Sequence, residues 1–182
     1  MKSYVRNALV LVLCGSPLWC ATLERLSLDD MIAKSTGIVR GKVTNSWAAA
    51  SGVVIYTHYT IQVAERLKGS GGDIEEIVVP GGEVNQLRQS FSGAPVLQTG
   101  TEYVLFLYAS KDGFTYVVGL TQGLFRISAD GTVDPLATRT ASRELMLDPA
   151  SGKPVKDQTL VMHVSDLRSQ VSSRLAAKGV GK

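Results

Sequence analysis

The segment VVIYTHYTIQVAERLKG (residues 53–69) has the most regular pattern in the chain. Its side chains alternate in character, which predicts a long β-strand because successive strand residues point to opposite faces. The even-numbered side chains, with His58 among them, predict a mixed face that meets both solvent and neighbouring groups. His58 and Tyr59 therefore point in opposite directions and cannot form one site. The odd-numbered side chains predict a buried face: Val53, Ile55, Thr57, Tyr59, Ile61 and Val63.

Further strand signals lie on both sides of this segment. IVRGKVTNSWAA (38–49) is joined to it by small, flexible residues, which predicts a β-hairpin. A third strand ends at Pro80 and the glycines that follow it. Turn residues at Lys111-Asp112-Gly113 and at Asp130-Gly131 predict two more hairpins. The segments concerned are IEEIVVPGG (74–82), EYVLFLYAS (102–110), FTYVVGL (114–120) and LFRISADGTVD (124–134).

Two helices are predicted, one near each end of the chain. In LSLDDMIAKSTG (26–37), Ser27 is a good N-cap and two aspartates suit the first turn. VSDLRSQVSSRLAAKG (164–179) is amphipathic, with Ser165 as its cap. Its apolar side is formed by Leu167, Val171 and Leu175.

Together these elements predict a mainly β fold. Glycines inside strands favour a small, curled, antiparallel OB-like barrel over a flat sheet. We expect the barrel domain to span residues 22–136, with a short N-terminal helix. Residues 137–182 are expected to form an irregular segment and a C-terminal amphipathic helix packed on the barrel. The predicted core is Val39, Val43, Ile55, Tyr59, Ile61, Val63, Ile77, Val79, Val104, Phe106, Val117 and Phe125.

Residues 1–21 have the layout of a secretory signal peptide. Two basic residues precede a short apolar run, and the expected cut follows Cys20 or Ala21. The apolar run is too short to span a membrane, which takes about 20 apolar residues. Trp19 before Cys20 disfavours lipid attachment. We therefore expect an exported protein, periplasmic or extracellular.

Removing this segment changes the cysteine content and the charge. Both cysteines leave, so no disulfide is expected. Lys2 and Arg6 leave too, so 17 of the 19 basic residues face 16 acids and the net charge is +1. A charge so close to neutral disfavours nucleic acid as a partner.

Several motifs resemble those of a family of exported bacterial proteins of unassigned function. The resemblance covers roughly residues 23–134. The order of elements is also similar to the OB-like barrel of netrin and metalloproteinase-inhibitor domains. Those inhibitors place an N-terminal cysteine on zinc, so their mechanism is not implied for a mature chain without cysteine. The motifs are LDDMIAKSTGIVRGKV (28–43), YTHYTIQVAERLKG (56–69), VPGG (79–82), GTEYVLFL (100–107) and GLTQGLFRI (119–127).

No motif for catalysis or cofactor binding is found in the sequence. The two histidines, His58 and His163, lie in different predicted elements. Zinc motifs, a nucleophile elbow and phosphate-binding loops are missing. Glu75 and Glu76 are neighbours on a strand, so they face opposite ways and cannot act as an acid–base pair. We expect no cofactor, no metal and no enzymatic activity.

Two connecting segments are candidate binding surfaces. PGGEVNQLRQSFSGAPVLQTG (80–100) is long for a loop, and its alternation predicts a short strand inside it. GLTQGLF (119–125) has glycines that allow a bulge or a close backbone approach. The predicted ligand-binding residues are Arg88, Phe91, Tyr116 and Gln122.

Three functions remain open at this point. The leading one is a monomeric, non-catalytic binding or interaction module for a protein or polysaccharide ligand. The second is a structural or assembly component of the cell envelope, suggested by eight bases against four acids between Arg139 and Lys182. The third is a hydrolase of unfamiliar type. Against it, no recognisable motif in the sequence places a nucleophile beside a base.

Overall fold

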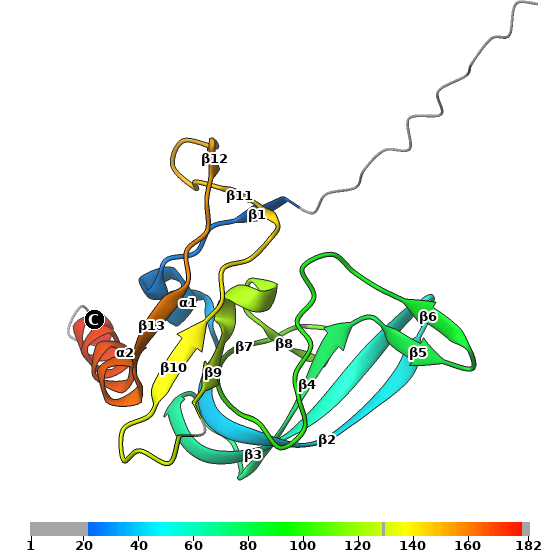
Figure 1. Cartoon of the computed structure of the whole chain (residues 1–182), viewed down its shortest axis with the longest axis horizontal. Helices are drawn as coiled ribbons and strands as arrows, with labels where there is room; N and C mark the ends of the chain where they lie inside the picture. The colour runs from blue at the N-terminus through cyan, green and yellow to red at the C-terminus, as the bar shows by residue number, and fades with distance from the viewer. Residues whose placement is uncertain (1–21, 129, 180–182) are drawn as a thin grey trace, which may run out of the picture.

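The computed structural model describes residues 22–128 and 130–179 (Figure 1). The predicted signal peptide, residues 1–21, lies outside the described residues. The chain is mainly β, as predicted, with two α-helices and one 3-10 turn among the described residues. These are α1 (Leu28–Lys34), α2 (Val164–Gly179) and η1 (Leu120–Gly123).

One eight-stranded sheet forms the body of the molecule. Its order is β13-β10-β9-β7-β2-β3-β4, with β8 paired to β7 beside this path, and every pairing is antiparallel. The strands are β2 (Gly37–Ser51), β3 (Val54–Lys68), β4 (Ile74–Pro80), β7 (Glu102–Ala109), β8 (Thr115–Val117), β9 (Leu124–Ile127), β10 (Leu136–Arg139) and β13 (Leu160–His163).

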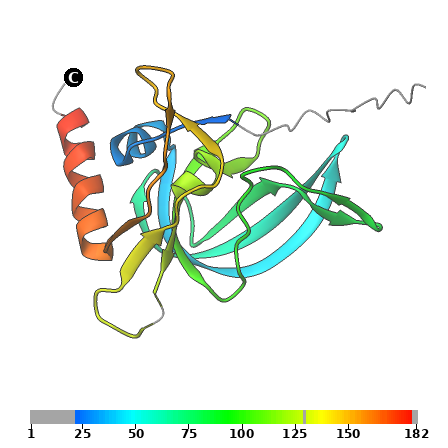
Figure 2. The ribbon, with the colours of Figure 1, turned by 45° about the horizontal axis from the view of Figure 1, so that its top comes forward.

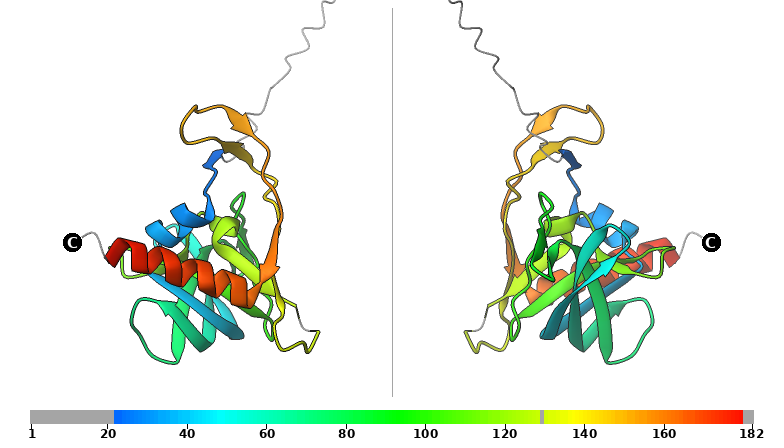
Figure 3. Two further views of the ribbon diagram at one scale, coloured as in Figure 1. Left: turned by 90° about the vertical axis from the view of Figure 1, so that its left-hand side faces the viewer. Right: turned by 90° about the vertical axis from the view of Figure 1, so that its right-hand side faces the viewer.

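Two small sheets accompany the main one. β1 runs parallel to β11, and β12 completes this three-stranded sheet, which projects from the body of the molecule (Figures 1 and 3). β5 and β6 form a hairpin within the long segment 80–100, so the short strand predicted there is present. The strands are β1 (Thr22–Glu24), β5 (Gly82–Val84), β6 (Leu87–Gln89), β11 (Leu145–Leu147) and β12 (Pro154–Val155).

The main sheet curls, as predicted, but it does not close into a barrel. β4 is the last strand of the order, and no hydrogen-bonded pairing joins it to β8 among the described residues. β8 has only three residues, and β4 ends at Pro80, which has no N–H to donate. Side chains meet at this β4–β8 boundary instead, where Val78, Val79 and Pro80 line the same small cavity as Tyr116 and Val117.

The core lies on both sides of the sheet. One cluster fills the curl of β2, β3, β4 and β7, while the other lies between the sheet and the two helices. β7 contributes to both, since Val104 and Phe106 face the helices while Leu105 and Leu107 face the curl. This explains why its sequence is an unbroken apolar run. The predicted core residues are all buried except Val63, which is partly buried.

Residues 137–182 are more regular than predicted. β10 and β13 belong to the main sheet, and β10 crosses the predicted domain boundary at residue 136. These strands are short and carry no clear alternation, so the sequence pattern did not reveal them. No helix among the described residues is long and apolar enough to cross a membrane.

The helix α2 is present, but its cap differs from the prediction. The helix begins at Val164, and the carboxylate of Asp134 accepts hydrogen bonds from the N–H (3.0 Å) and the hydroxyl (2.6 Å) of Ser165. Val164, Leu167 and Val171 are buried against the sheet. α2 therefore lies beside α1 along one side of the molecule (Figure 2).

Candidate functional site

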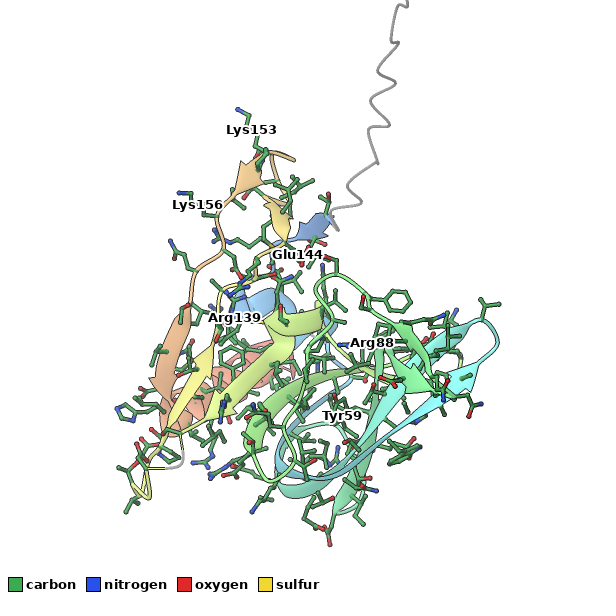
Figure 4. All side chains as sticks on the ribbon, turned by 45° about the vertical axis from the view of Figure 1, so that its right-hand side comes forward. Tyr59, Arg88, Arg139, Glu144, Lys153 and Lys156 are labelled. Carbon is green, nitrogen blue, oxygen red and sulfur yellow. The ribbon has the colours of Figure 1, made fainter. Side chains whose placement is uncertain are left out.

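The structure does not bring the four predicted ligand-binding residues together. Arg88 is exposed in β6 (Figure 4), and Phe91, after that strand, is 42% exposed. Tyr116 lies in β8 and Gln122 in η1. Within the described part of the chain, no hydrogen bond, ion pair or ring contact joins any two of them.

Gln122 is a structural residue. Its side chain is buried, with the residue only 1% exposed. Its amide oxygen accepts the Leu26 N–H at 2.8 Å, and its amide nitrogen donates to the Glu24 carbonyl at 2.9 Å. Gln122 thus ties the N-terminal segment to η1, and a ligand cannot reach it.

Tyr116 belongs to an aromatic cluster on the outer face of the sheet, formed by Trp47, Tyr56, His58, Phe114 and Tyr116. The rings of Trp47 and His58 stack at 5.1 Å, and Phe114 meets His58 edge-on at 6.0 Å. His58 also bonds Glu76 through Nδ1 at 2.9 Å, and its side chain is only 13% exposed. This agrees with the mixed face predicted for His58, but the side chain is more covered than expected, because the rings of Trp47 in β2 and Phe114 just before β8 pack against it.

This outer aromatic cluster covers the β4–β8 boundary. Rings from β3 and from the β7–β8 turn lie against one another there, with Tyr56 5.4 Å from Phe114. Val78 of β4, which is on the same face, is only 1% exposed as a result. Burial raises the pKa of Tyr116, and its hydrogen bond to Asp112 (2.8 Å) raises it further. The cluster thus packs together parts of the sheet that no strand pairing joins.

A serine, a histidine and an aspartate meet where α2 begins, but they do not form a catalytic triad. In a triad the histidine lies between the serine and the acid. Here Ser165 donates directly to Asp134, and His163 Nδ1 lies 3.0 Å from the Asp134 carbonyl oxygen. Across the described residues, no group of three His, Cys, Asp or Glu side chains is placed to hold a metal ion.

A concave surface lies over β9 and β10. One cavity of about 370 Å³ is bounded by the loop 93–98 and by residues 140–144, with Glu144 at its wall (Figure 4). A second cavity of about 400 Å³ continues toward Lys42 and the loop at residues 100–102. The two share Arg126, Thr138 and Thr140, so they meet. We call the combined surface the β9–β10 groove.

One hydroxyl on the wall of this groove has no partner. Thr121 lines the first cavity, and its Oγ1 is buried without a hydrogen bond among the described residues. Buried polar atoms are nearly always paired in folded proteins. Loss of such a bond commonly costs about 1–3 kcal/mol. Because this Oγ1 is itself buried, a ligand in the cavity does not contact it without a local rearrangement.

A buried ion pair positions the wall at residues 140–144. Arg139 donates to both carboxylate oxygens of Asp157, at 3.0 and 2.7 Å, and the Ser142 N–H donates to the same carboxylate at 2.7 Å. Both side chains are almost fully buried, at 4% and 1% exposed. Burial acts to raise the pKa of Asp157, but the hydrogen bonds from Arg139 and Ser142 outweigh it, and the pKa is lowered.

Sequence reasoning missed this groove. Its walls come from segments far apart in the chain, and the 140–144 wall lies in the stretch predicted to be irregular. Both segments predicted as candidate binding surfaces nevertheless contribute to the groove. Residues 80–100 supply Gly93, Ala94, Val96 and Gln98. The other segment, GLTQGLF, was selected for its glycines. It contributes Thr121 and Leu124 to the groove, rather than the predicted Gln122.

Comparison with models of known protein families gives no match, and neither does comparison with curated proteins. The resemblance to exported bacterial proteins therefore stays a prediction. The β9–β10 groove is the feature from which a function can be inferred.

Proposed function

We propose that this protein is a non-catalytic binding module that holds an extended ligand in the β9–β10 groove. The supporting observation is that two cavities, each within the usual size range of ligand sites, meet at Arg126, Thr138 and Thr140. Two connected cavities can each hold one unit of a chain-like ligand, so they fit an extended polymer better than one compact molecule.

The chemistry of the lining supports binding rather than catalysis. Neither cavity is lined by a histidine or a cysteine. The two acids are engaged, with Glu102 bonded to Arg40 and Glu144 to Ser92. The Ser92 hydroxyl lies beside the Glu144 carboxylate, but no histidine joins them to form a serine–histidine–acid arrangement in this lining.

The alternative role in the cell envelope rested on the basic residues near the C-terminus. Three of these are used within the molecule: Arg139 pairs with Asp157, Arg168 with Glu65 and Arg174 with Asp29. Fewer positive charges near the C-terminus are therefore available to bind components of the cell envelope. The β9–β10 groove supports a function better than these residues do.

We also propose that the module works outside the cytoplasm, because residues 1–21 have a signal-peptide layout. The intact mass of protein recovered from the exported fraction should correspond to a start at Ala21 or Thr22 without lipid. Recovery of only the full-length chain from the cytoplasm would contradict export.

Binding can be tested by NMR with a panel of named probes. We would record amide spectra of the ¹⁵N-labelled protein with cellohexaose, hexagalacturonate, a chitosan hexamer and hexaglutamate. At least one probe should shift amides of β9, β10 and residues 140–144. Ala141→Trp, which fills the groove, should abolish the shifts, whereas Ala50→Trp at the exposed end of β2 should not. The proposal fails if no probe moves those amides.

A further inference from the structure

Resting on the proposed function, we infer that the groove takes a linear anionic oligosaccharide, such as a chain of uronic acids. Three features of the lining support this inference. Its cations have no partner, and its acids already accept hydrogen bonds. Its hydroxyl groups lie over strands that are paired on both sides, so a peptide cannot be added there as another strand.

Three cations line the groove. Lys42 and Arg126 line the second cavity, and Arg126 and Arg143 line the first. All three side chains are exposed. Within residues 22–128 and 130–179, none of them makes an ion pair or a side-chain hydrogen bond. Their charges and donors are thus available to an anionic ligand.

The acids of the groove do not cancel these charges. Glu102 accepts from Arg40 at 2.8 and 3.3 Å, so its charge is balanced by a cation on β2. Glu144 accepts from the neutral Ser92 hydroxyl at 3.0 Å, so no cation balances its charge. One unbalanced acid against three free cations leaves the groove positive. Arginine binds carboxylates especially well because its planar group can donate two parallel hydrogen bonds.

The remaining polar groups suit a sugar better than a peptide. Hydroxyl and amide side chains both donate and accept hydrogen bonds, as sugar hydroxyls do. A peptide bound as an added strand needs a free sheet edge. β9 is paired on both sides, with β7 and β10, and β10 is paired with β9 and β13. The polar groups are those of Gln98, Thr138, Thr140 and Ser142.

The test compares ligands that differ only in charge. Calorimetric titration of the protein with hexagalacturonate should give saturable binding that weakens between 50 and 200 mM NaCl, because salt screens exposed charges. Its fully methyl-esterified form, which is neutral, should bind at least about tenfold more weakly, the effect of losing one strong charged contact. Arg126→Gln should weaken hexagalacturonate binding by a similar factor. Arg88→Gln, which removes an exposed cation outside the groove, is the matched control and should change it less than about twofold.

The outcomes separate two proposals: that the groove binds a ligand, and that this ligand is an anionic oligosaccharide. Equal affinity for the acid and its ester, or no binding of hexagalacturonate, overturns the anionic ligand. Tighter binding of hexaglutamate overturns the sugar class. The binding function survives all three results if another probe still shifts amides of the β9–β10 groove, and it fails only if none does.

Discussion

At the scale of single residues, neighbouring positions on β3 have different surroundings. Tyr59 is 4% exposed and lies in the cluster inside the curl, where burial raises its pKa. His58 points the other way and packs between Trp47 and Phe114. The strand is therefore covered on both sides near its middle.

Tyr59→Ala should lower the free energy of unfolding by about 3 kcal/mol or more, as large-to-small core substitutions do. His58→Ala should cost about 1 kcal/mol, because it loses a stacked ring and a partner in Glu76. Urea unfolding measures both. Val53→Ala, at a site 89% exposed, is the control and should stay within about 0.5 kcal/mol. Val53 was predicted on the buried face but lies before β3 begins, so equal losses at Tyr59 and Val53 would contradict the burial of Tyr59.

The buried pair of Arg139 and Asp157 gives a prediction about pH. Removing one partner leaves a buried charge, so Asp157→Asn should destabilise the protein by about 3 kcal/mol at pH 7. The folded-state pKa of Asp157 is lowered, so its stabilising effect is complete above the unfolded pKa of about 4 and is lost as pH falls below it. The difference between wild type and variant should therefore shrink toward pH 3 in urea unfolding.

Asp29→Asn provides the control for this prediction. Asp29 pairs with Arg174 in an exposed ion pair, with side chains 53% and 60% exposed. Exposed pairs contribute little, so the change should stay within about 0.5 kcal/mol at both pH values. A similar loss of unfolding free energy in the two variants would contradict the stabilising role proposed for the buried Asp157.

At the scale of elements, β8 is held by side chains as much as by strand pairing. It has three residues and pairs only with β7 among the described strands. Phe114 and Tyr116 place their rings against Tyr56 of β3. The outer aromatic cluster thus connects a short edge strand to the opposite side of the curled sheet.

Phe114→Ala should weaken the aromatic packing that joins β8 to β3. We expect a loss of about 2 kcal/mol in the free energy of unfolding, because the ring packs against two others and His58. Hydrogen exchange at the amides of β8 should accelerate, while exchange in the β2–β3 hairpin should change little. Phe91→Ala, which removes an exposed ring outside the cluster, should affect neither measurement. Unchanged protection of β8 in the Phe114 variant would contradict the proposed role.

At the scale of the whole molecule, apolar burial on both sides of one sheet holds the fold together. Residues 22–182 contain no cysteine. The structure groups no three metal-binding side chains within its described part. The two core clusters share β7, so they stabilise the sheet from both faces.

The thermal midpoint of residues 22–182 should therefore be insensitive to EDTA and to dithiothreitol. We expect a shift of less than about 2 °C with either reagent, which is under about 1 kcal/mol for a chain of this size. Differential scanning calorimetry checks this. A clear drop with EDTA would reveal a metal site and reopen the question of catalysis.

The central strands, their hairpins and most of the core follow from the sequence alone. Alternation of side chains along β3, turn residues at Asp112-Gly113 and the capping pattern at Ser27 are local, so neighbouring residues suffice to predict them. In the structure, the backbone N–H of Ser27 donates to the Asp30 carboxylate, and the backbone N–H of Asp30 donates to the Ser27 hydroxyl, at the start of α1.

Other features depend on residues that are distant in the chain, and only the tertiary structure decided them. Whether the sheet closes depends on how β4 meets β8, and the burial of His58 depends on Phe114. Gln122 is structural because Leu26 reaches it, with 96 positions between the two in sequence numbering. One wall of the β9–β10 groove, residues 140–144, is positioned by the hydrogen-bonded pair of Arg139 and Asp157. No local pattern encodes such pairings, since each requires the chain to fold before its partners meet.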